Sequence, residues 1–451
     1  MTDAASAADS DGTGATPRKG LAARLLSPIA DVHDDEVSSV LLLALTMFLI
    51  LAGYYLLKTA REQFILSEGG AAVKSYSSAG QALLLLILVP AYGAFASRVN
   101  RAQLIQWVTL FFVACLGLFV LALSAGLHVG IVYFIWVGIF NVMVIAQFWA
   151  FANDLYTEEQ GKRLFPLIGV GSSLGAWIGS MRAGFLVESF GPRRLLVGGA
   201  AALLVCIALA RLVDRISSRG RTPLAARSSE KIESSQSGFG MILSDRYLLL
   251  IAVMTVLLNV VNASGEYLFG RYVVAAAGRL TSDPTAQQAF IGQSYSSYFS
   301  YINFIGFMMQ MFVVSRIFKF LGVGRALFIH PIVAFTGYAL LLRTPSFEAI
   351  RWLKIADNSL DYSLGNTTKQ ALWLPTSRAA KYKAKQAIDS FCVRAGDVLQ
   401  AGIIYAGELA GTTTGGFAAL NTVFAFGWLM TAMGLRKRLA TQAREAGRQE
   451  L

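Results

Sequence analysis

The chain has 451 residues, of which 55% are hydrophobic and only 15% are charged, and its formal net charge is +12. Soluble domains carry about 25% charged residues, so this composition excludes an ordinary soluble protein and indicates a membrane protein. The positive charge does not call for a nucleic-acid partner, because Lys and Arg of multi-span proteins collect in cytoplasmic loops. Here most of them fall in loops that are cytoplasmic if the N-terminus is inside.

The first 36 residues are polar and rich in acids, which argues against a cleaved signal sequence and against an organelle transit peptide. We expect a disordered cytoplasmic tail over residues 1–36, followed by twelve transmembrane helices, because apolar runs near the roughly 20 residues that cross a bilayer recur along the chain. The predicted spans lie at residues 38–58, 76–97, 103–125, 129–151, 164–187, 194–213, 245–268, 289–314, 325–343, 347–373, 385–409 and 416–435. A bacterial inner-membrane protein with both termini in the cytoplasm is expected.

A polar, Ser-rich and basic stretch over residues 214–240 has the composition of a flexible cytoplasmic linker. It divides the chain into two six-helix bundles, residues 37–213 and residues 241–435, before a cytoplasmic tail at residues 436–451. The stretches from Leu41 and Leu248 have similar character, so the bundles resemble repeats. Transporters built from such repeats hold their substrate at the repeat interface near the middle of the membrane.

The fifth span contains "GVGSSLGAWIGSMRAG", residues 169–184. Its glycines at positions 171, 175 and 179 are spaced by four, which is typical of close helix packing in membranes and not of a phosphate-binding loop between a strand and a helix. Arg182 at the end of this stretch is a candidate partner for an anion.

The tenth span holds the polar stretch "IADNSLDYSLGNTTKQALWLP", residues 355–375. A charge at the centre of a span costs about 2.5–3.5 kcal/mol, so this helix is predicted to line a cavity, with Asp361 near mid-membrane and Lys369 two turns nearer the cytoplasm. Span eleven carries Arg394 and Asp397. The structural alternative is that Arg394 pairs with Asp361 or Asp397 and joins spans ten and eleven.

No nucleophile motif and no metal-ligand spacing is present in the sequence, so neither an enzyme nor a cofactor is expected. The three cysteines fall within spans and predict no disulfide. Lys58 in the first span and Glu266 in the seventh take corresponding places in the two repeats, and a direct substrate role is predicted for both and for Lys369. Because Lys58 ends its apolar run, snorkelling to the outer interface is its alternative.

Five stretches carry a resemblance to known transporters. "GAFASRVNR" (93–101) resembles the loop motif of the major facilitator superfamily, in which the first, fourth, seventh and tenth helices line the central cavity. "YYLLKTARE" (54–62), "FWAFANDLYTEEQGKRLFPLIGVGSSLG" (148–175), and "DYSLGNTTKQALWLP" with "KYKAKQAIDSFCVRAGD" (361–397) resemble the ATP/ADP translocase family of plastids and obligate intracellular bacteria.

The resemblance implies that intramembrane charges are needed for exchange, and Lys58, Glu266 and Lys369 take what resemble three of those positions. Asn153 belongs to the Phe-Ala-Asn motif at the end of span four. Where the family tends to carry an acid in that span, this chain has Asn141, which leaves phosphorylated substrates other than ATP and ADP open.

The sequence therefore predicts an all-α membrane transporter of the major facilitator type that exchanges nucleotides or related phosphorylated anions by alternating access. A monomer in the lipid bilayer is expected, with a net positive cavity, because the intramembrane cations outnumber the acids. Two rivals stay open: a proton-coupled carrier of another small metabolite, and a sensor or scaffold that does not transport. The predicted substrate-binding residues are Lys58, Asn141, Asn153, Arg182, Glu266, Asp361, Lys369 and Arg394, and the predicted pairing or coupling acids are Glu266, Asp361 and Asp397.

Overall fold

The computed structural model describes residues 32–34, 36–96, 101–217, 237–377 and 379–445, and these residues are helical apart from short turns. The N-terminal helices are α2 (Val37–Ala96), α3 (Arg101–Ser124), α4 (Gly130–Leu155), α5 (Glu158–Phe190) and α6 (Pro192–Ser217). The C-terminal helices are α7 (Gly238–Ser244), α8 (Arg246–Leu280), α9 (Pro284–Met308), η2 (Met309–Val313), α10 (Val314–Ala326), α11 (Ile329–Arg343), α12 (Phe347–Leu360), η3 (Asp361–Gly365), α13 (Asn366–Ala371), η4 (Ala380–Ala384), α14 (Lys385–Ala387), η5 (Ile388–Cys392), α15 (Val393–Leu409) and α16 (Thr414–Glu445), where η marks a π-helical segment.

Eight helices in the described ranges are long and apolar enough to cross a membrane. The all-helical, multi-span class is thereby confirmed, whereas the number twelve stays a prediction. The helix α2 contains the first two expected spans. Gly70, with φ of 72°, breaks it in the middle and so divides it into two helical segments. The ninth expected span is the short helix α11, and charges within the tenth and eleventh lower their hydropathy.

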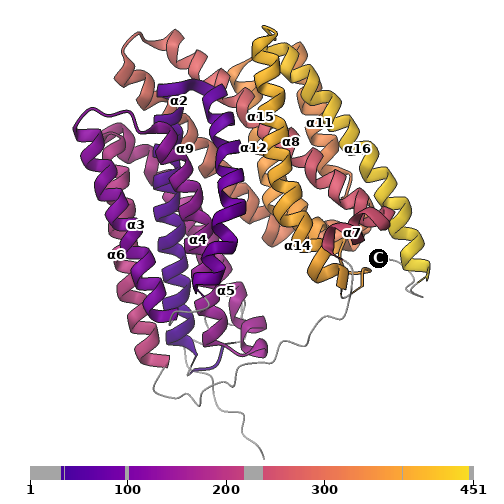
Figure 1. Ribbon diagram of the computed structural model, residues 1–451, viewed down its shortest axis with the longest axis horizontal. Helices are drawn as coiled ribbons and strands as arrows, with labels where there is room; N and C mark the ends of the chain where they lie inside the picture. Colours follow the sequence, from indigo (N-terminus) through magenta and orange to yellow (C-terminus); the bar gives the residue numbers. More distant parts are fainter. Residues whose placement is uncertain (1–31, 35, 97–100, 218–236, 378, 446–451) are drawn as a thin grey trace, which may run out of the picture.

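Parts of the predicted organisation lie outside the described residues. These are most of the tail at 1–36, most of the linker at 214–240 and much of the motif at 93–101. The division into two six-helix bundles is therefore an expectation, although the helices before and after the linker form two groups that stand side by side (Figure 1).

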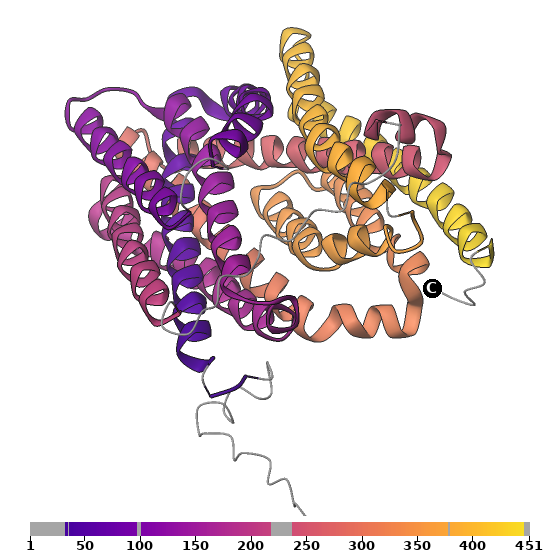
Figure 2. The same cartoon turned by 60° about the horizontal axis from the view of Figure 1, so that its bottom comes forward.

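The two groups of helices touch through α2, α5, α8, α9 and α15. In Figure 1 they meet at the end that holds the Gly70 turn and diverge toward the end that holds the start of α5 and α14, and Figure 2 shows the same separation from below. Tyr55 of α2 donates a hydrogen bond to Asn303 of α9 (2.9 Å), and the Asn303 amide donates to Ser180 Oγ of α5 (3.0 Å). Near the turn, Gln63 donates to the backbone carbonyl of Gln288 (3.0 Å).

The N-terminal end of α2 is joined to the start of α5, which begins with a capping box formed by Thr157 and Gln160. Glu36, just before α2, accepts hydrogen bonds from Arg163 (2.8 Å) and Gln160 (3.1 Å). Burial alone would raise the pKa of Glu36, but the hydrogen bonds from Arg163, the backbone N–H of His33 and Gln160 hold that pKa below its usual range.

The glycines spaced by four in α5 pack against the backbone of α2. A methyl group on Gly171 or Gly175 would overlap the carbonyls of Ala44 and Phe48, and one on Gly179 would lie 2.5 Å from Cα of Ala52. The prediction that this stretch serves helix packing is confirmed.

Replacing Gly175 with alanine should therefore destabilise the protein, because the methyl group forces α2 and α5 apart. We expect a loss of about 1–3 kcal/mol, the usual cost of overpacking, measured as a lower midpoint of thermal unfolding in detergent. Gly169→Ala is the matched control, since a methyl group there meets nothing within 4 Å. A Gly175→Ala protein as stable as the control would contradict this packing.

Candidate functional site

A cavity of about 880 Å3, including its solvent-filled mouth, lies between the two groups of helices. We call it the central cavity. Helices α2, α8, α12 and α15 contribute to its wall, together with Phe134 of α4 and Phe299 of α9. Its charged lining residues are Lys58, Arg61, Glu62, Lys74, Glu266 and Asp397.

Helix α2 supplies four of these charges. Lys58, Arg61 and Glu62 lie at three- and four-residue spacing and so share one face of the helix. The turn at Gly70 brings the following segment back, so that Lys74 Nζ lies 2.7 Å from Glu62 Oε2. Arg61 donates to Glu62 Oε1 (2.5 Å), and its guanidinium lies over the Phe134 ring at 4.4 Å. Glu62, only 1% exposed, is thus held between two cations.

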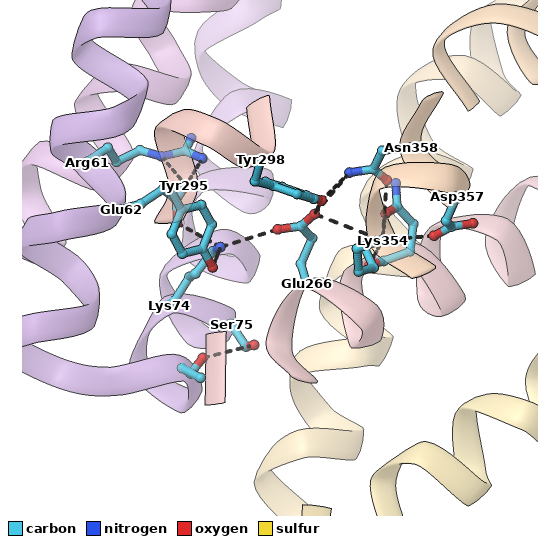
Figure 3. Close-up of polar contacts among 12 residues, drawn as sticks. Arg61, Glu62, Lys74, Ser75, Glu266, Tyr295, Tyr298, Lys354, Asp357 and Asn358 are labelled. Atoms are coloured by element: carbon cyan, nitrogen blue, oxygen red, sulfur yellow. Dashed lines mark hydrogen bonds and ion pairs between the residues drawn. The ribbon is translucent and has the colours of Figure 1, made fainter. Parts of the chain in front are cut away.

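One ion pair crosses between the two groups of helices. Lys74 Nζ lies 3.5 Å from Oε2 of Glu266 on α8 (Figure 3). The other oxygen of Glu266 accepts hydrogen bonds from Tyr298 Oη (2.5 Å) and from the Asn358 amide (3.0 Å), and it lies 3.9 Å from Lys354 Nζ. Glu266 therefore has contacts to both groups of helices.

The line of charges continues on the C-terminal side of the cavity. Lys354 is fully buried, and its ammonium donates to Asp357 Oδ2 (2.8 Å) and to Asn262 Oδ1 (2.6 Å). Asp357 Oδ1 lies 2.9 Å from Nε2 of His330. We call this sequence of contacts the charge chain: Arg61, Glu62, Lys74, Glu266, Lys354, Asp357 and His330. Opposite charges alternate along it, which offsets the cost of desolvating each one.

Lys58 differs from these cations because no carboxylate pairs with it in the described part of the chain. Its ammonium instead faces three aromatic rings, at 4.2 Å from the centre of Phe299, 5.2 Å from Tyr55 and 5.9 Å from Tyr54. Cation–π contacts of this kind are worth about 0.5–2 kcal/mol and leave an ammonium able to bind an anion. The ammonium of Lys58 lines the central cavity, whereas the snorkelling alternative places it at the outer membrane interface.

The other predicted site residues have different surroundings. Lys369 pairs with Asp361 (3.2 Å), and Arg394 lies 3.8 Å from Asp397. Arg394 thus lies beside Asp397 of its own helix, α15, and Asp361 pairs with Lys369, so the expected charge pair that joins spans ten and eleven is not found among the described residues. The π-helical segment η3 begins at Asp361, and Lys369 comes about two turns later, in α13, which continues directly from it.

Three further predicted residues do not line the central cavity. Arg182 and Asn153 are exposed, and Asn141 is half-buried with its amide oxygen unpartnered. Their substrate roles, like that of Lys369, stay predictions. The expectation of a net positive cavity is wrong. Three cations line the central cavity, Lys58, Arg61 and Lys74, and three acids balance them, Glu62, Glu266 and Asp397. The positive charge without a partner is local to Lys58.

The sequence reasoning missed most of the charge chain. Arg61 and Glu62 belong to the stretch 54–62 that carries the resemblance, which gives them no separate role, and Lys74 lies between the first two expected spans. The signal for Arg61 and Glu62 is their helical spacing from Lys58, whereas the place of Lys74 depends on the turn at Gly70. Among the described residues, no group of three His, Cys, Asp or Glu side chains is placed to hold a metal ion.

Comparisons with known sequences agree with the resemblance. The family model "TLC ATP/ADP transporter" matches residues 19–130. The ADP,ATP carrier protein 4 of Rickettsia bellii is 25% identical over 297 residues, which cover 55% of this chain and 54% of that protein. The ADP,ATP carrier protein 1 of Chlamydia trachomatis serovar D is 23% identical over 356 residues, which cover 69% of this chain and 65% of that protein. The chain thus spans about half the length of the first of these curated relatives.

Comparisons with solved structures identify the fold. A bacterial homologue of the human lysosomal transporter Spinster, inward-facing and unoccupied, matches with a TM-score of 0.55 at 15% identity, covering 91% of this chain and 96% of that one. A bacterial homologue of the iron transporter ferroportin, in its inward-facing state, has a TM-score of 0.61 at 13% identity, covering 87% and 99%. These neighbours support a major facilitator-like fold.

The buried pair of Lys354 and Asp357 should be sensitive to the loss of one partner. Asp357→Asn leaves Lys354 with Glu266, 3.9 Å away, as its nearest carboxylate in the described part of the chain, so we expect a loss of about 3–5 kcal/mol in the free energy of unfolding. Combining it with Lys354→Met should recover most of that loss. Glu348→Gln, which breaks the exposed pair with Arg351 on the same helix, is the control and should cost at most about 1 kcal/mol. Equal losses in the single and double variants would contradict the pairing.

Proposed function

We propose that this chain, a distant relative of the TLC ATP/ADP transporters, is a membrane transporter that exchanges nucleotides or related phosphorylated anions by alternating access. The observation that carries the proposal is Lys58, a cation in the central cavity with no carboxylate partner in the described part of the chain. Phosphate oxygens form short, charge-assisted hydrogen bonds with an ammonium. Lys58 is therefore the group that we assign to the phosphate of the cargo.

The surroundings of Lys58 support an organic anion over a bare inorganic one. The rings of Tyr55 and Phe299 lie beside the ammonium, and aromatic faces of this kind stack on planar groups such as a nucleobase. Arg61 and Lys74 lie in the same wall but are already paired with Glu62. They would add to the positive electrostatic potential at the cargo without leaving Glu62. Glu266, Lys369, Arg394, Asn141, Asn153 and Arg182 stay further candidate contacts in other steps of the cycle.

We place both termini in the cytoplasm of a bacterial cell, in the inner membrane, and we assign the diverging end of the two groups of helices to the cytoplasmic side. The end with the Gly70 turn would then be the closed outer gate. Its hydrogen bonds from Gln63 and Tyr55 and the ion pair of Lys74 with Glu266 cross between the groups of helices. These contacts would break when the carrier opens to the outside.

Lys58→Gln should abolish nucleotide exchange while the protein still folds, because a neutral polar side chain is less costly in the membrane than a charge but binds phosphate weakly. The measurement is the exchange of labelled ATP for internal ADP in proteoliposomes. Lys319→Gln, at an exposed position on α10, is the matched control and should exchange at the wild-type rate. Near-normal exchange by Lys58→Gln would remove this residue from the site.

Exchange of unlike nucleotides should respond to an imposed membrane potential. A triphosphate and a diphosphate differ by about one charge, and moving one charge across 100 mV is worth roughly 2.3 kcal/mol. Labelled nucleotide uptake should also require nucleotide on the opposite side, and sugars, amino acids or neutral nucleosides should not replace it. Efficient transport of a neutral solute, with no binding of nucleotides, would contradict the phosphate assignment. Nucleotide binding without any flux would instead indicate a sensor.

A further inference from the structure

His330 of α11 lies at the far end of the charge chain, away from the central cavity. The residue is 5% exposed, and its ring packs edge-on against Trp428 of α16, with ring centres 4.7 Å apart. Its Nε2 lies 2.9 Å from Asp357 Oδ1. Neither the proposed cargo site nor the helix packing requires an ionisable ring at this place.

The hydrogen bonds define which nitrogen of His330 carries a proton. Asp357 accepts a hydrogen bond from Lys354 at its other oxygen, so its carboxylate is an acceptor for both neighbours. Nε2 of His330 must then be the donor, which in a neutral imidazole leaves a lone pair on Nδ1. Nδ1 is buried and has no hydrogen-bond partner in the described part of the chain. An acceptor left in this condition is costly, and a proton placed on it removes that cost only if it finds a partner such as water.

A second, smaller cavity, of about 310 Å3 including the open space at its mouth, lies beside Nδ1, and we call it the side pocket. Its wall is mostly apolar, but it includes His330, Thr368 and Lys369. The hydroxyl of Thr368 is also buried without a hydrogen-bond partner. Gly365 keeps this place open, since a methyl group there would lie 3.1 Å from Nδ1. Two unpartnered polar groups at one pocket provide the contacts that a water or hydronium needs.

We propose that Nδ1 of His330 is a binding site for a proton whose binding is linked to that of the anionic cargo. The cargo part rests on the proposed function. With His330 neutral, the charge chain is balanced, because Arg61, Lys74 and Lys354 match Glu62, Glu266 and Asp357. A proton on His330 adds one positive charge to the chain and no covalent bond other than N–H is formed.

The path of the linkage follows from the contacts. An imidazolium holds Asp357 more strongly, which frees Lys354 to approach Glu266, now 3.9 Å away. Glu266 then offsets less of the charge of Lys74, so the positive potential at the central cavity rises while Lys74 stays paired with Glu62. Linkage is reciprocal, so an anion in the cavity favours the proton on His330 to the same extent.

Other ionisable groups face His330 from the elements packed around it. Asp357 of α12 contacts the ring directly and Trp428 of α16 packs on it, Lys369 of α13 lines the same pocket, and Asp361 of η3 lies near Gly365 as Nδ1 does. Lys354 of α12, Glu266 of α8 and Tyr338 of α11 follow one or two contacts further away, through Asp357. Lys354 and Asp357 form a pair, as do Lys369 and Asp361, so the two pairs leave the local charge nearly balanced when His330 is neutral. Histidine is the group whose protonation ordinarily changes between about pH 5 and about pH 8.

The test has one measurement that does not involve cargo. NMR of the full-length protein with 15N-labelled histidine, in lipid, recorded between about pH 5 and about pH 8, should show a proton added to Nδ1 of His330 as the pH falls. The His330 signal is the one lost in His330→Gln. Asp357→Asn should move the titration to lower pH, because the anion beside the imidazolium is lost. Gly365→Ala should move it in the same direction, because the methyl group closes the space at Nδ1. A His330 ring that keeps one protonation state across this range would overturn the proposal.

The second measurement is nucleotide affinity as a function of pH. A site linked to one proton changes affinity by at most about tenfold per pH unit, and we expect wild type to bind more tightly as pH falls. In His330→Gln the contribution of His330 to the pH dependence of nucleotide affinity should vanish. The ionisation of the nucleotide itself contributes equally in both proteins. His128→Gln, at an exposed position, is the matched control and should keep the wild-type slope.

The outcomes separate the two proposals. Equal pH slopes in wild type and His330→Gln would overturn the linkage to cargo. If His330 titrates and responds to Asp357→Asn, but no nucleotide or phosphorylated anion binds at any pH, the proton site stands and the proposed function fails. If exchange proceeds and His330 does not titrate, the proposed function stands and the proton site is wrong.

Discussion

Charges inside a membrane protein must find opposite charges, and this constraint organises the centre of the molecule. Burying a single ion costs roughly several kcal/mol. The charge chain meets that cost by alternation, because each of its inner members contacts an opposite charge on both sides, from Arg61 on α2 to Asp357 on α12. Within each group of helices these contacts hold the helices that carry them together, and the pair of Lys74 with Glu266 joins the two groups. Lys58 lies beside the charge chain and has no carboxylate partner in the described part of the protein. Its ammonium is therefore the cation of this region that can bind an anionic ligand.

The backbone positions that make the chain possible are few. Gly70 adopts a positive φ, which L side chains rarely tolerate, and this lets α2 turn so that Lys74 meets Glu62. The glycines of α5, including Gly175, let that helix approach the first half of α2. The same half of α2 carries Lys58. Close packing behind the helix thus fixes the position of the charges in front of it, which links the fold to the proposed site.

The sequence predicted the class of fold and part of the site, for physical reasons that can be named. Apolar runs are a direct signal of membrane helices, and the polar stretch after Ile355 correctly indicated a helix that must contact other polar groups, since Asn358 lines the central cavity. Lys58 and Glu266 were found because charges in apolar runs are conspicuous. Lys74 was missed because it follows the turn and its return toward Glu62 depends on one dihedral angle at Gly70. The partner of Asp361 could not be predicted either, because both Lys369 and Arg394 lie at plausible distances from it along the sequence.

The ion pair between Lys74 and Glu266 can break without leaving either ion unpaired. Lys74 has a closer partner in Glu62 at 2.7 Å, on its own side of the interface. Glu266 keeps Tyr298, Asn358 and Lys354 on the other side. Separation of the two groups of helices therefore costs the energy of one 3.5 Å contact and not that of two unpaired buried ions. A carrier that alternates between two states needs such an interface, because a contact worth several kcal/mol would hold it in one state. Neutral hydrogen bonds such as that from Tyr55 to Asn303, each worth about 1 kcal/mol, complete an interface of this kind.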